Sequence, residues 1–340
     1  MFEQQKTNSI ITRIALSLTL VIFLLVCGCA NTGPQISKDE LKKLEEEIEA
    51  LATEIFIKDW VRTWKIGFNV LSVMSEGTLK NSAVIGALIV DNSEDIARLF
   101  GLPVEDGCVL VGVVDSYIAD LAGLKPGDLI REIGGKEIKD SEQIAFENGK
   151  LTIIIVERDG DRLSFEVEPK EMPYVRVRLK QTGKINAYAK FSGIQFTSGM
   201  VHFVEDDDEL AVIMGHEIAH LVSKHLSKNI RMAALCGVVG GLTGPFAPLT
   251  TQALYAPYSR VNEREADYLG LFYAHAAGYN IEIGATLWKR FALEIPGSRS
   301  KSFLRSHPAS PERILRVKKV VELIKSNKNP YRQEGLVNEK

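Results

Sequence analysis

The sequence is poor in three features that would assign it to a familiar class of protein. Its 4 cysteines in 340 residues are too few for a disulfide scaffold. Its net charge of −3 provides no basic surface, so no nucleic-acid partner is expected. Beyond the N-terminus, no apolar run reaches the roughly 18 residues of a membrane-spanning helix. These absences exclude a disulfide scaffold and a nucleic-acid-binding protein, and they argue against a membrane-embedded enzyme that processes lipidated or transmembrane substrates, which is a further alternative.

The residues that are present have the composition of an ordinary folded chain. Hydrophobic residues make up 45% of the sequence and charged residues 25%, which excludes extensive disorder. At roughly 100–200 residues per domain, the length predicts two or three domains. The apolar stretch 230–258 is interrupted repeatedly by glycine and proline. We therefore expect it to form a helix and a loop beside a cleft rather than a membrane span.

The N-terminus contains one uncharged apolar run, Ile14–Gly28. Its 15 residues fall short of the roughly 20 of a membrane span and suit the core of a secretory signal. The run ends in the sequence VCGC at 26–29, which resembles a bacterial lipobox; a plain anchoring helix is the alternative. The resemblance implies lipidation of Cys29 and a lipid-anchored, periplasm-facing protein of the bacterial cell envelope. No aspartate follows Cys29, which favours the outer membrane over the inner.

An amphipathic helix is expected next, after a short tether. Apolar residues recur there at spacings of three and four, which is the period of one helical face. The aromatic segment 60–68 follows, and we expect it to pack against a larger body. The residues that carry the pattern are Leu41, Leu44, Ile48, Leu51 and Ile55.

The region 83–173 changes to short β-rich runs separated by turn residues. Asp159-Gly160 predicts a β-hairpin, and Gly127 suits a turn position with positive φ. Residues 107–140 resemble a PDZ domain of the kind attached to bacterial envelope proteases, most specifically in AGLKPGDLI at 122–130. The resemblance implies that C-terminal peptides bind here as an added strand. The receiving loop it implies is Gly107, Cys108, Val109 and Leu110; a packing module with a closed groove is the alternative.

A candidate metal motif lies in EDDDELAVIMGHEIAH, residues 205–220. Asp206 and Glu209 predict a capping box that opens a helix. His216 and His220 are four residues apart, so both imidazoles lie on one helical face and can reach one Zn²⁺. Glu217 adjoins the first histidine, where it can take a proton from the attacking water and pass it to the leaving amine.

The third ligand is sought in NEREAD, residues 262–267. Glu263 and Asp267 share a helical face and have the spacing used by gluzincins, in which the glutamate binds zinc and the aspartate orients the first histidine. We predict these roles for Glu263 and for Asp267 toward His216. Glu265 is the competing ligand, and His225 has the wrong spacing for a metzincin site. His202 and His275 are expected to be structural.

Four segments in order resemble zinc metallopeptidases of the family that contains HtpX and the CAAX prenyl proteases: 185–201, 207–220, 262–279 and 306–314. The resemblance implies one zinc ion per chain and a strand beside the cleft that pairs with the substrate backbone. That strand comprises Asn186, Ala187, Tyr188 and Ala189. His307, in SHPASPERI, is implied to donate to the tetrahedral oxyanion or to regulate the open metal position; a histidine fixed by its local turn is the alternative.

The sequence thus predicts an α+β protein with a mostly helical gluzincin domain, a small edge β-sheet and a β-rich PDZ domain. The expected function is zinc-dependent endopeptidase activity on unfolded or misassembled envelope polypeptides. A non-catalytic PDZ lipoprotein scaffold with a structural zinc is the alternative. The predicted parts are a signal peptide (1–28), a tether and helix (29–80), the PDZ domain (81–173), the metallopeptidase domain (174–325) and a tail (326–340).

Overall fold

The structure is a computed structural model that describes residues 34, 36–190, 192–223, 260–295, 307 and 309–326. The chain divides into two compact units, Met1–Glu49 and Ala50–Lys340. The predicted signal, Cys29 and the stretch 230–258 lie outside the described residues. No helix in the described ranges has the length and apolar character needed to cross a membrane.

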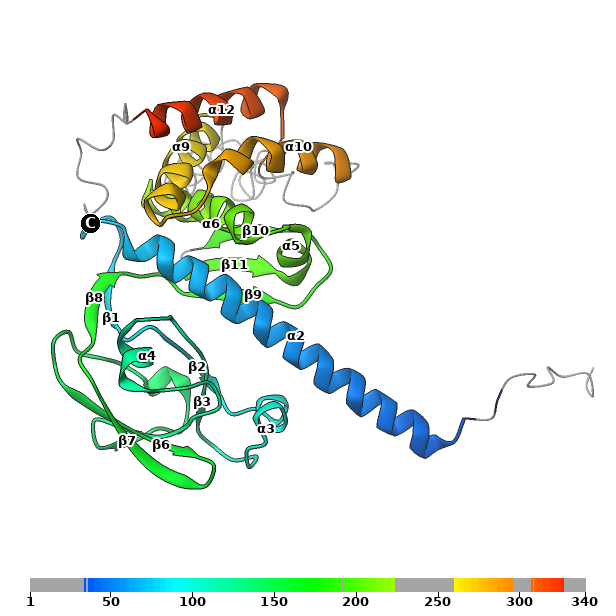
Figure 1. Cartoon of the computed structure of the whole chain (residues 1–340), viewed down its shortest axis with the longest axis vertical. Coiled ribbons are helices and arrows are strands. Elements are labelled where there is room, and N and C mark those ends of the chain that lie inside the picture. The colour runs from blue at the N-terminus through cyan, green and yellow to red at the C-terminus, as the bar shows by residue number, and fades with distance from the viewer. Residues whose placement is uncertain are drawn as a thin grey trace, which may run out of the picture. The chain divides into compact units, whose positions relative to one another are not determined.

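One long helix, α2 (Lys38–Ser72), occupies the start of the described chain (Figure 1). The predicted helix is therefore confirmed, but its apolar stripe from Leu41 to Ile55 is exposed. Burial begins further along, where Trp64 and Phe68 are each 2% exposed. The aromatic segment thus packs into the core of the protein as expected.

The β-rich region forms a sheet of antiparallel strands with the order β2-β3-β4-β6-β7. Strand β5 (Lys136–Glu137) pairs with β4 beside this path, and β1 (Asn81–Val84) pairs with β8 (Lys170–Pro173). Short helices α3 (Glu94–Phe100), α4 (Ile118–Ala122) and η1 (Ser141–Gln143) connect the strands. The main strands are β2 (Ala87–Asp91), β3 (Cys108–Val113), β4 (Leu129–Ile133), β6 (Thr152–Arg158) and β7 (Asp161–Val167).

Two turn predictions in this region are confirmed. Asp159 and Gly160 both have positive φ, 55° and 86°, and connect β6 to β7 as a hairpin. Gly127 has a φ of 95°, a conformation that glycine adopts without steric cost. Both turns therefore contain glycine at a position with positive φ, as the sequence predicts.

A second, smaller sheet has the strand order β10-β11-β9. Strand β11 (Gly193–Thr197) pairs antiparallel with β10 (Ala187–Lys190) and parallel with β9 (Val177–Lys180). The helices that follow are α5 (Ser198–Phe203), α6 (Asp207–Val222), α9 (Arg260–Ala276), η2 (Ile281–Ile283), α10 (Gly284–Glu294) and α12 (Pro311–Lys325).

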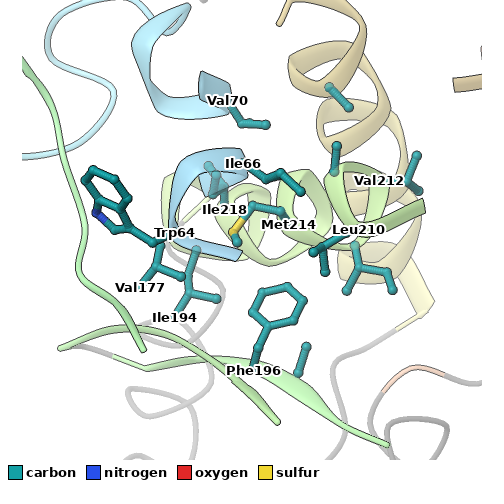
Figure 2. Close-up of a cluster of buried hydrophobic side chains, with 14 of the residues drawn as sticks. Trp64, Ile66, Val70, Val177, Ile194, Phe196, Leu210, Val212, Met214 and Ile218 are labelled. Atoms are coloured by element: carbon teal, nitrogen blue, oxygen red, sulfur yellow. The ribbon is translucent and has the colours of Figure 1, made fainter. Parts of the chain in front are cut away.

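The hydrophobic core joins the second half of α2 to the smaller sheet and to α6. Figure 2 shows Trp64, Ile66 and Val70 of α2 gathered with Met214 and Ile218 of α6. A separate cluster fills the interior of the β-rich region. The molecule is therefore a mixed helix and strand protein of the α+β type, as expected; the domain boundaries at 81 and 174 stay a prediction.

Candidate metal centre and active site

Helix α6 begins where the capping pattern predicts. The backbone N–H of Glu209 donates to Asp206 Oδ1 at 2.8 Å, and the Glu209 carboxylate accepts from the N–H of Glu205 at 2.9 Å. These contacts satisfy backbone donors that a helix start would otherwise leave unpaired. The cap fixes the start of a helix whose last two turns carry His216, Glu217 and His220, all of them buried.

Two glycines let α9 approach α6 closely. A Cβ built on Gly215 would collide with the carbonyl oxygen of Gly270, and one built on Gly270 would collide with the backbone nitrogen of His216. Only glycine permits such backbone contact. This close crossing brings Glu263 and Asp267 of α9 to the histidine face of α6.

Four side chains meet at this crossing: His216, His220, Glu263 and His307. They are buried, and one ligand atom from each lies within 4.8 Å of the others. The two α6 histidines are 3.1 Å apart at Nε2, and His220 Nε2 lies 3.3 Å from Glu263 Oε1. Imidazole nitrogens and a carboxylate oxygen at such separations form a donor set suited to a divalent metal.

Asp267 contacts the far side of the first histidine. Its Oδ1 lies 3.1 Å from His216 Nδ1, on the ring nitrogen opposite the ligand cluster. Burial lowers the pKa of His216, but hydrogen bonds with Asp267 and Glu263 outweigh burial and raise it to about 9. Burial raises the pKa of Asp267. The charge of Arg313 and the hydrogen bond between Asp267 and His216 outweigh burial and lower this pKa below its usual range. The carboxylate therefore stays ionised and can orient the imidazole.

The surroundings of Glu217 are the strongest evidence that this site suits a metal-dependent reaction. It is 0% exposed, and within the described residues neither carboxylate oxygen has a hydrogen-bond partner. His307 Nε2 is near it, at 3.5 Å. A buried carboxylate without donors is costly in free energy, so a group absent from these contacts must complete the site. A metal ion with its water fits this position beside the donor set.

His307 lies inside the cluster, not beside it. Its Nδ1 is 3.1 Å from both oxygens of Glu263 and 3.1 Å from His216 Nε2. It is also 0% exposed. The sequence anticipated a role near the metal, and the geometry makes His307 a fourth potential ligand.

The other candidates lie apart from the cluster. Glu265 accepts a hydrogen bond from Ser223 at 2.7 Å, and it is absent from the ligand set, as expected. His202 pairs with Asp59 at 2.6 Å, and His275 lies exposed near the end of α9. His225 lies outside the described residues.

The predicted substrate strand is at the edge of the smaller sheet. Strand β10 contains Ala187, Tyr188 and Ala189, and Asn186 precedes it. Among the described strands, β10 pairs only with β11, and it contacts helix α6. Its pairing with a substrate stays a prediction.

The predicted peptide-receiving loop is wrong in position. Cys108, Val109 and Leu110 lie in β3, which pairs with β2 on one side and β4 on the other. The carbonyl of Gly107 accepts from Asn92, and the N–H of Leu110 donates to Asp128. An interior strand with both edges paired cannot accept an added strand. Turn residues before β3 resembled a loop, but only the sheet order shows which strand is free.

Two residues that contact the candidate ligands or their partners, Arg313 and Trp288, were hard to recognise from the sequence. Arg313 binds Asp267 through two hydrogen bonds, of 2.8 and 2.6 Å, and its Cζ lies 3.4 Å from the ring centroid of Trp288. Arg313 belongs to the segment 306–314, whose pattern suggests only that this arginine holds the loop around His307. Nothing in the spacing of Trp288 marks it, because it reaches the site from α10.

Comparison with known proteins supports a metalloprotease. Residues 155–321 match Peptidase family M48. The mitochondrial metalloendopeptidase OMA1 of Arabidopsis thaliana is 31% identical over 44% of this chain and 30% of its own length. A putative beta-barrel assembly-enhancing protease of Vibrio cholerae is 29% identical, covering 46% and 36%. The corresponding protease of Escherichia coli is 26% identical, covering 40% and 32%. The chain thus spans about a third of the length of these relatives.

The solved structures that resemble part of this chain give low TM-scores. The HtrA-type protease AlgW with a decapeptide gives a TM-score of 0.26 at 27% identity, covering 28% of this chain and 30% of that one. The HtrA3 PDZ domain bound to a phage-derived ligand gives 0.24 at 20% identity, covering 27% and 88%. The region matched to family M48 supports a hydrolase of the metallopeptidase class; the narrower resemblance to HtpX and the prenyl proteases stays a prediction.

Proposed function

We propose that this protein is a zinc-dependent metalloendopeptidase that hydrolyses peptide bonds of unfolded or misassembled cell-envelope proteins. The observation that carries the proposal is the convergence of His216, His220 and Glu263 beside Glu217, whose buried carboxylate lacks hydrogen-bond partners among the described residues. Histidine and carboxylate donors of this kind suit zinc. The match to Peptidase family M48 supports the same reaction class.

Glu217 is the proton carrier of the proposed reaction. A bound zinc ion supplies Lewis-acid polarisation of the scissile carbonyl and lowers the pKa of water. Glu217 takes a proton from the attacking water and delivers it to the leaving amine, for which its carboxylate must be free of competing donors. Asp267 holds His216 in a fixed ring orientation during this cycle.

His307 has two roles compatible with its position. If three protein ligands hold zinc, the His307 ring is placed to donate to the oxyanion. If His307 is itself a fourth ligand, it closes the position that substrate needs and the resting protein is latent. The contact of His307 Nδ1 with Glu263 supports the second role, and the proximity of Nε2 to Glu217 supports the first.

Substrate is proposed to bind as a strand along β10. An extended peptide added to an edge strand forms main-chain hydrogen bonds, which ignore side-chain identity. That mode of binding suits unfolded chains of varied sequence. The contact between β10 and α6 supports this mode of binding, because α6 is the helix that carries His216 and His220.

A peptide groove in the β-rich region is proposed at β2 in place of β3. Strand β2 ends the sheet order, so one of its edges is unpaired among the described strands. A cavity of about 810 Å³ is lined by the residues of β2 together with Ile144 and Phe146. An unpaired edge beside apolar side chains suits a C-terminal peptide that adds as a strand.

A labelled peptide series on the full chain carrying Glu217→Gln tests this groove without cleavage. Peptides with a free C-terminal carboxylate should bind more tightly than their amidated forms, and Phe146→Ala should weaken that binding. Equal binding of both forms would remove the peptide-presentation role and leave a packing module.

The location of the protein rests on its N-terminal sequence. Lipidation at Cys29 would anchor it to the bacterial envelope with its catalytic region in the periplasm, the outer membrane being favoured over the inner. The bacterial relatives named for β-barrel assembly support an envelope location. Labelling with a lipid precursor should mark the wild-type chain and not Cys29→Ala.

The central experiment measures zinc content and cleavage of unfolded casein by the wild-type chain and by Glu217→Gln. We expect about one zinc per chain in both, with a loss of cleavage of about 10²–10⁴-fold in the variant. Equal cleavage by both forms would sink the proposal. Zinc in both forms with cleavage in neither would favour a latent site, or the non-catalytic scaffold, and His307→Ala separates these because only the latent enzyme would gain activity.

A further inference from the structure

We propose that Arg313 is a positioning residue that holds one oxygen of Glu263 away from the metal, so that Glu263 binds through its other oxygen alone. This inference rests on the metallopeptidase function proposed above. Arg313 has no atom among the ligand donors; it acts through Glu263 and Asp267.

The guanidinium group of Arg313 bridges the two carboxylates of α9. Its Nε and Nη2 donate to the two oxygens of Asp267 at 2.8 and 2.6 Å. Its remaining nitrogen, Nη1, lies 3.0 Å from Glu263 Oε2. A planar fork of donors can bind two carboxylates in fixed directions at once, which a lysine ammonium cannot.

The two oxygens of Glu263 therefore have different surroundings. Oε2 lies 3.0 Å from Arg313 Nη1 and 3.5 Å from His216 Nε2, whereas Oε1 lies 3.3 Å from His220 Nε2. A carboxylate oxygen that accepts a charge-assisted hydrogen bond is a poorer metal ligand than its neighbour. Oε1 is thus the oxygen left for the metal, and a single-oxygen contact preserves a coordination position for substrate.

The position of Arg313 is fixed at one face of its guanidinium group and at its backbone. The guanidinium carbon lies 3.4 Å from the ring centroid of Trp288, and the residue is 6% exposed. Its backbone N–H donates to Ser310 Oγ at 3.2 Å, which caps α12, and Pro311 occupies the first turn. The helix cap, Pro311 and the ring of Trp288 together restrict the side chain of Arg313. Its guanidinium group is therefore oriented toward the two carboxylates before any metal binds.

His307 and Arg313, six residues apart in the sequence, both contact Glu263. His307 Nδ1 lies 3.1 Å from each of its oxygens, and Arg313 Nη1 lies 3.0 Å from Oε2. Glu263 is 6% exposed and cannot exchange these partners for water. Its orientation is therefore set by a segment remote in sequence from its own helix.

The test compares Arg313→Gln and Arg313→Lys with a matched control, Arg290→Gln, in the full chain. Arg290 makes the same kind of contacts away from the site: two hydrogen bonds to Glu209 at 2.8 and 2.7 Å, and stacking 4.9 Å from the centroid of Phe203. Metal affinity is measured by chelator competition with zinc. The visible absorption of the cobalt(II)-substituted protein reports coordination number, since four-coordinate cobalt absorbs more strongly than five-coordinate cobalt.

We expect Arg313→Gln to weaken zinc binding about 10–100-fold and to reduce the cobalt absorption, because Glu263 can then bind through both oxygens. Arg313→Lys should show the same spectral change with a smaller loss of affinity. Arg290→Gln should lower thermal stability and leave affinity and spectrum as in wild type. If Arg313→Gln keeps the wild-type spectrum, or if Arg290→Gln changes it equally, the inference is overturned.

A double variant separates the contact with Glu263 from simple charge balance with Asp267. If Arg313 only neutralised Asp267, adding Arg313→Gln to Asp267→Asn would cause no further change. We expect a further loss of zinc affinity and the same spectral shift, because the contact with Glu263 remains to be broken. A wild-type chain that binds no metal would overturn the proposed function itself; a wild type that binds zinc and cleaves casein, with variants unchanged, would overturn this inference alone.

Discussion

Two arginine–aspartate pairs, a partly exposed one in the β-rich sheet and a buried one at the candidate metal centre, use the same chemistry for different ends. In the sheet, Arg158 binds both oxygens of Asp128 at 2.6 and 2.7 Å. At the centre, Arg313 binds both oxygens of Asp267 at 2.8 and 2.6 Å. Each arginine also lies over an aromatic ring. Contact geometry alone does not distinguish the two.

The residues around each pair distinguish the two. Asp128 also accepts from the N–H of Lys125, and Arg158 donates to the carbonyl of Gly123, so the pair fastens a turn and its polar atoms are used locally. Beside the other pair lies Glu217, a buried carboxylate without hydrogen-bond partners among the described residues. In a purely structural pair we expect the neighbouring polar atoms to be hydrogen-bonded within the protein. Beside a functional pair we expect a buried polar atom without such a partner.

The largest expected effect concerns the ligand itself. Glu263→Gln should remove most zinc binding and all measurable cleavage, since an amide oxygen is a weak ligand for zinc. Glu265→Gln is the matched control, two residues away on α9 and bonded to Ser223 instead. It should retain zinc. Loss of zinc in the Glu265 variant, with retention in the Glu263 variant, would reverse the assignment.

The comparison of the pairs is tested directly at Asp267. Asp267→Asn should weaken zinc binding about 10–100-fold, because His216 loses the charged partner that orients its ring. Zinc affinity from chelator competition is the readout. An affinity equal to wild type would mean that this pair, like the one in the sheet, is only structural.

Asp128→Asn tests the other pair, in the β-rich sheet, where we expect a loss of stability and no loss of zinc. Breaking this pair should reduce the free energy of unfolding by about 1.5–3 kcal/mol, the range for a hydrogen bond to a charged group. Zinc content and casein cleavage at a temperature where the variant is folded should match wild type. Denaturant unfolding gives the first quantity; a specific loss of zinc would erase the distinction between the two regions.

The smallest effect is expected at Cys108, in the interior of the sheet. Burial, followed by the charges of Asp91 and Asp140, raises the pKa of this thiol to about 12. The pKa of Cys108 is higher in the folded chain than in the unfolded chain. The neutral thiol therefore stabilises the fold at a pH below the ordinary pKa of cysteine, and this stabilisation is lost as the pH rises toward 12. Alkylation of Cys108 in the native chain at pH 8, followed by peptide mapping, should be far slower than in urea. Equal rates would show that the sheet opens readily.

The helical part of the site was predictable because its signals are local. Positions four apart share a helical face whatever the rest of the fold does, so His216 with His220 and Glu263 with Asp267 follow from periodicity. Turn positions were equally local, as Gly127 and Gly160 show. The strand that receives a peptide could not be found this way, because a free edge is defined by which strands pair across the sheet.

The sequence by itself determined which side chains could serve as ligands and proton carrier, since residue chemistry and helical spacing are enough for that. Only the tertiary structure decided how they meet. The glycines at the α6–α9 crossing set the distance between the two helices, and the α12 cap aims Arg313 at Glu263. These contacts join segments far apart in the chain, and their geometry depends on packing that no local pattern encodes.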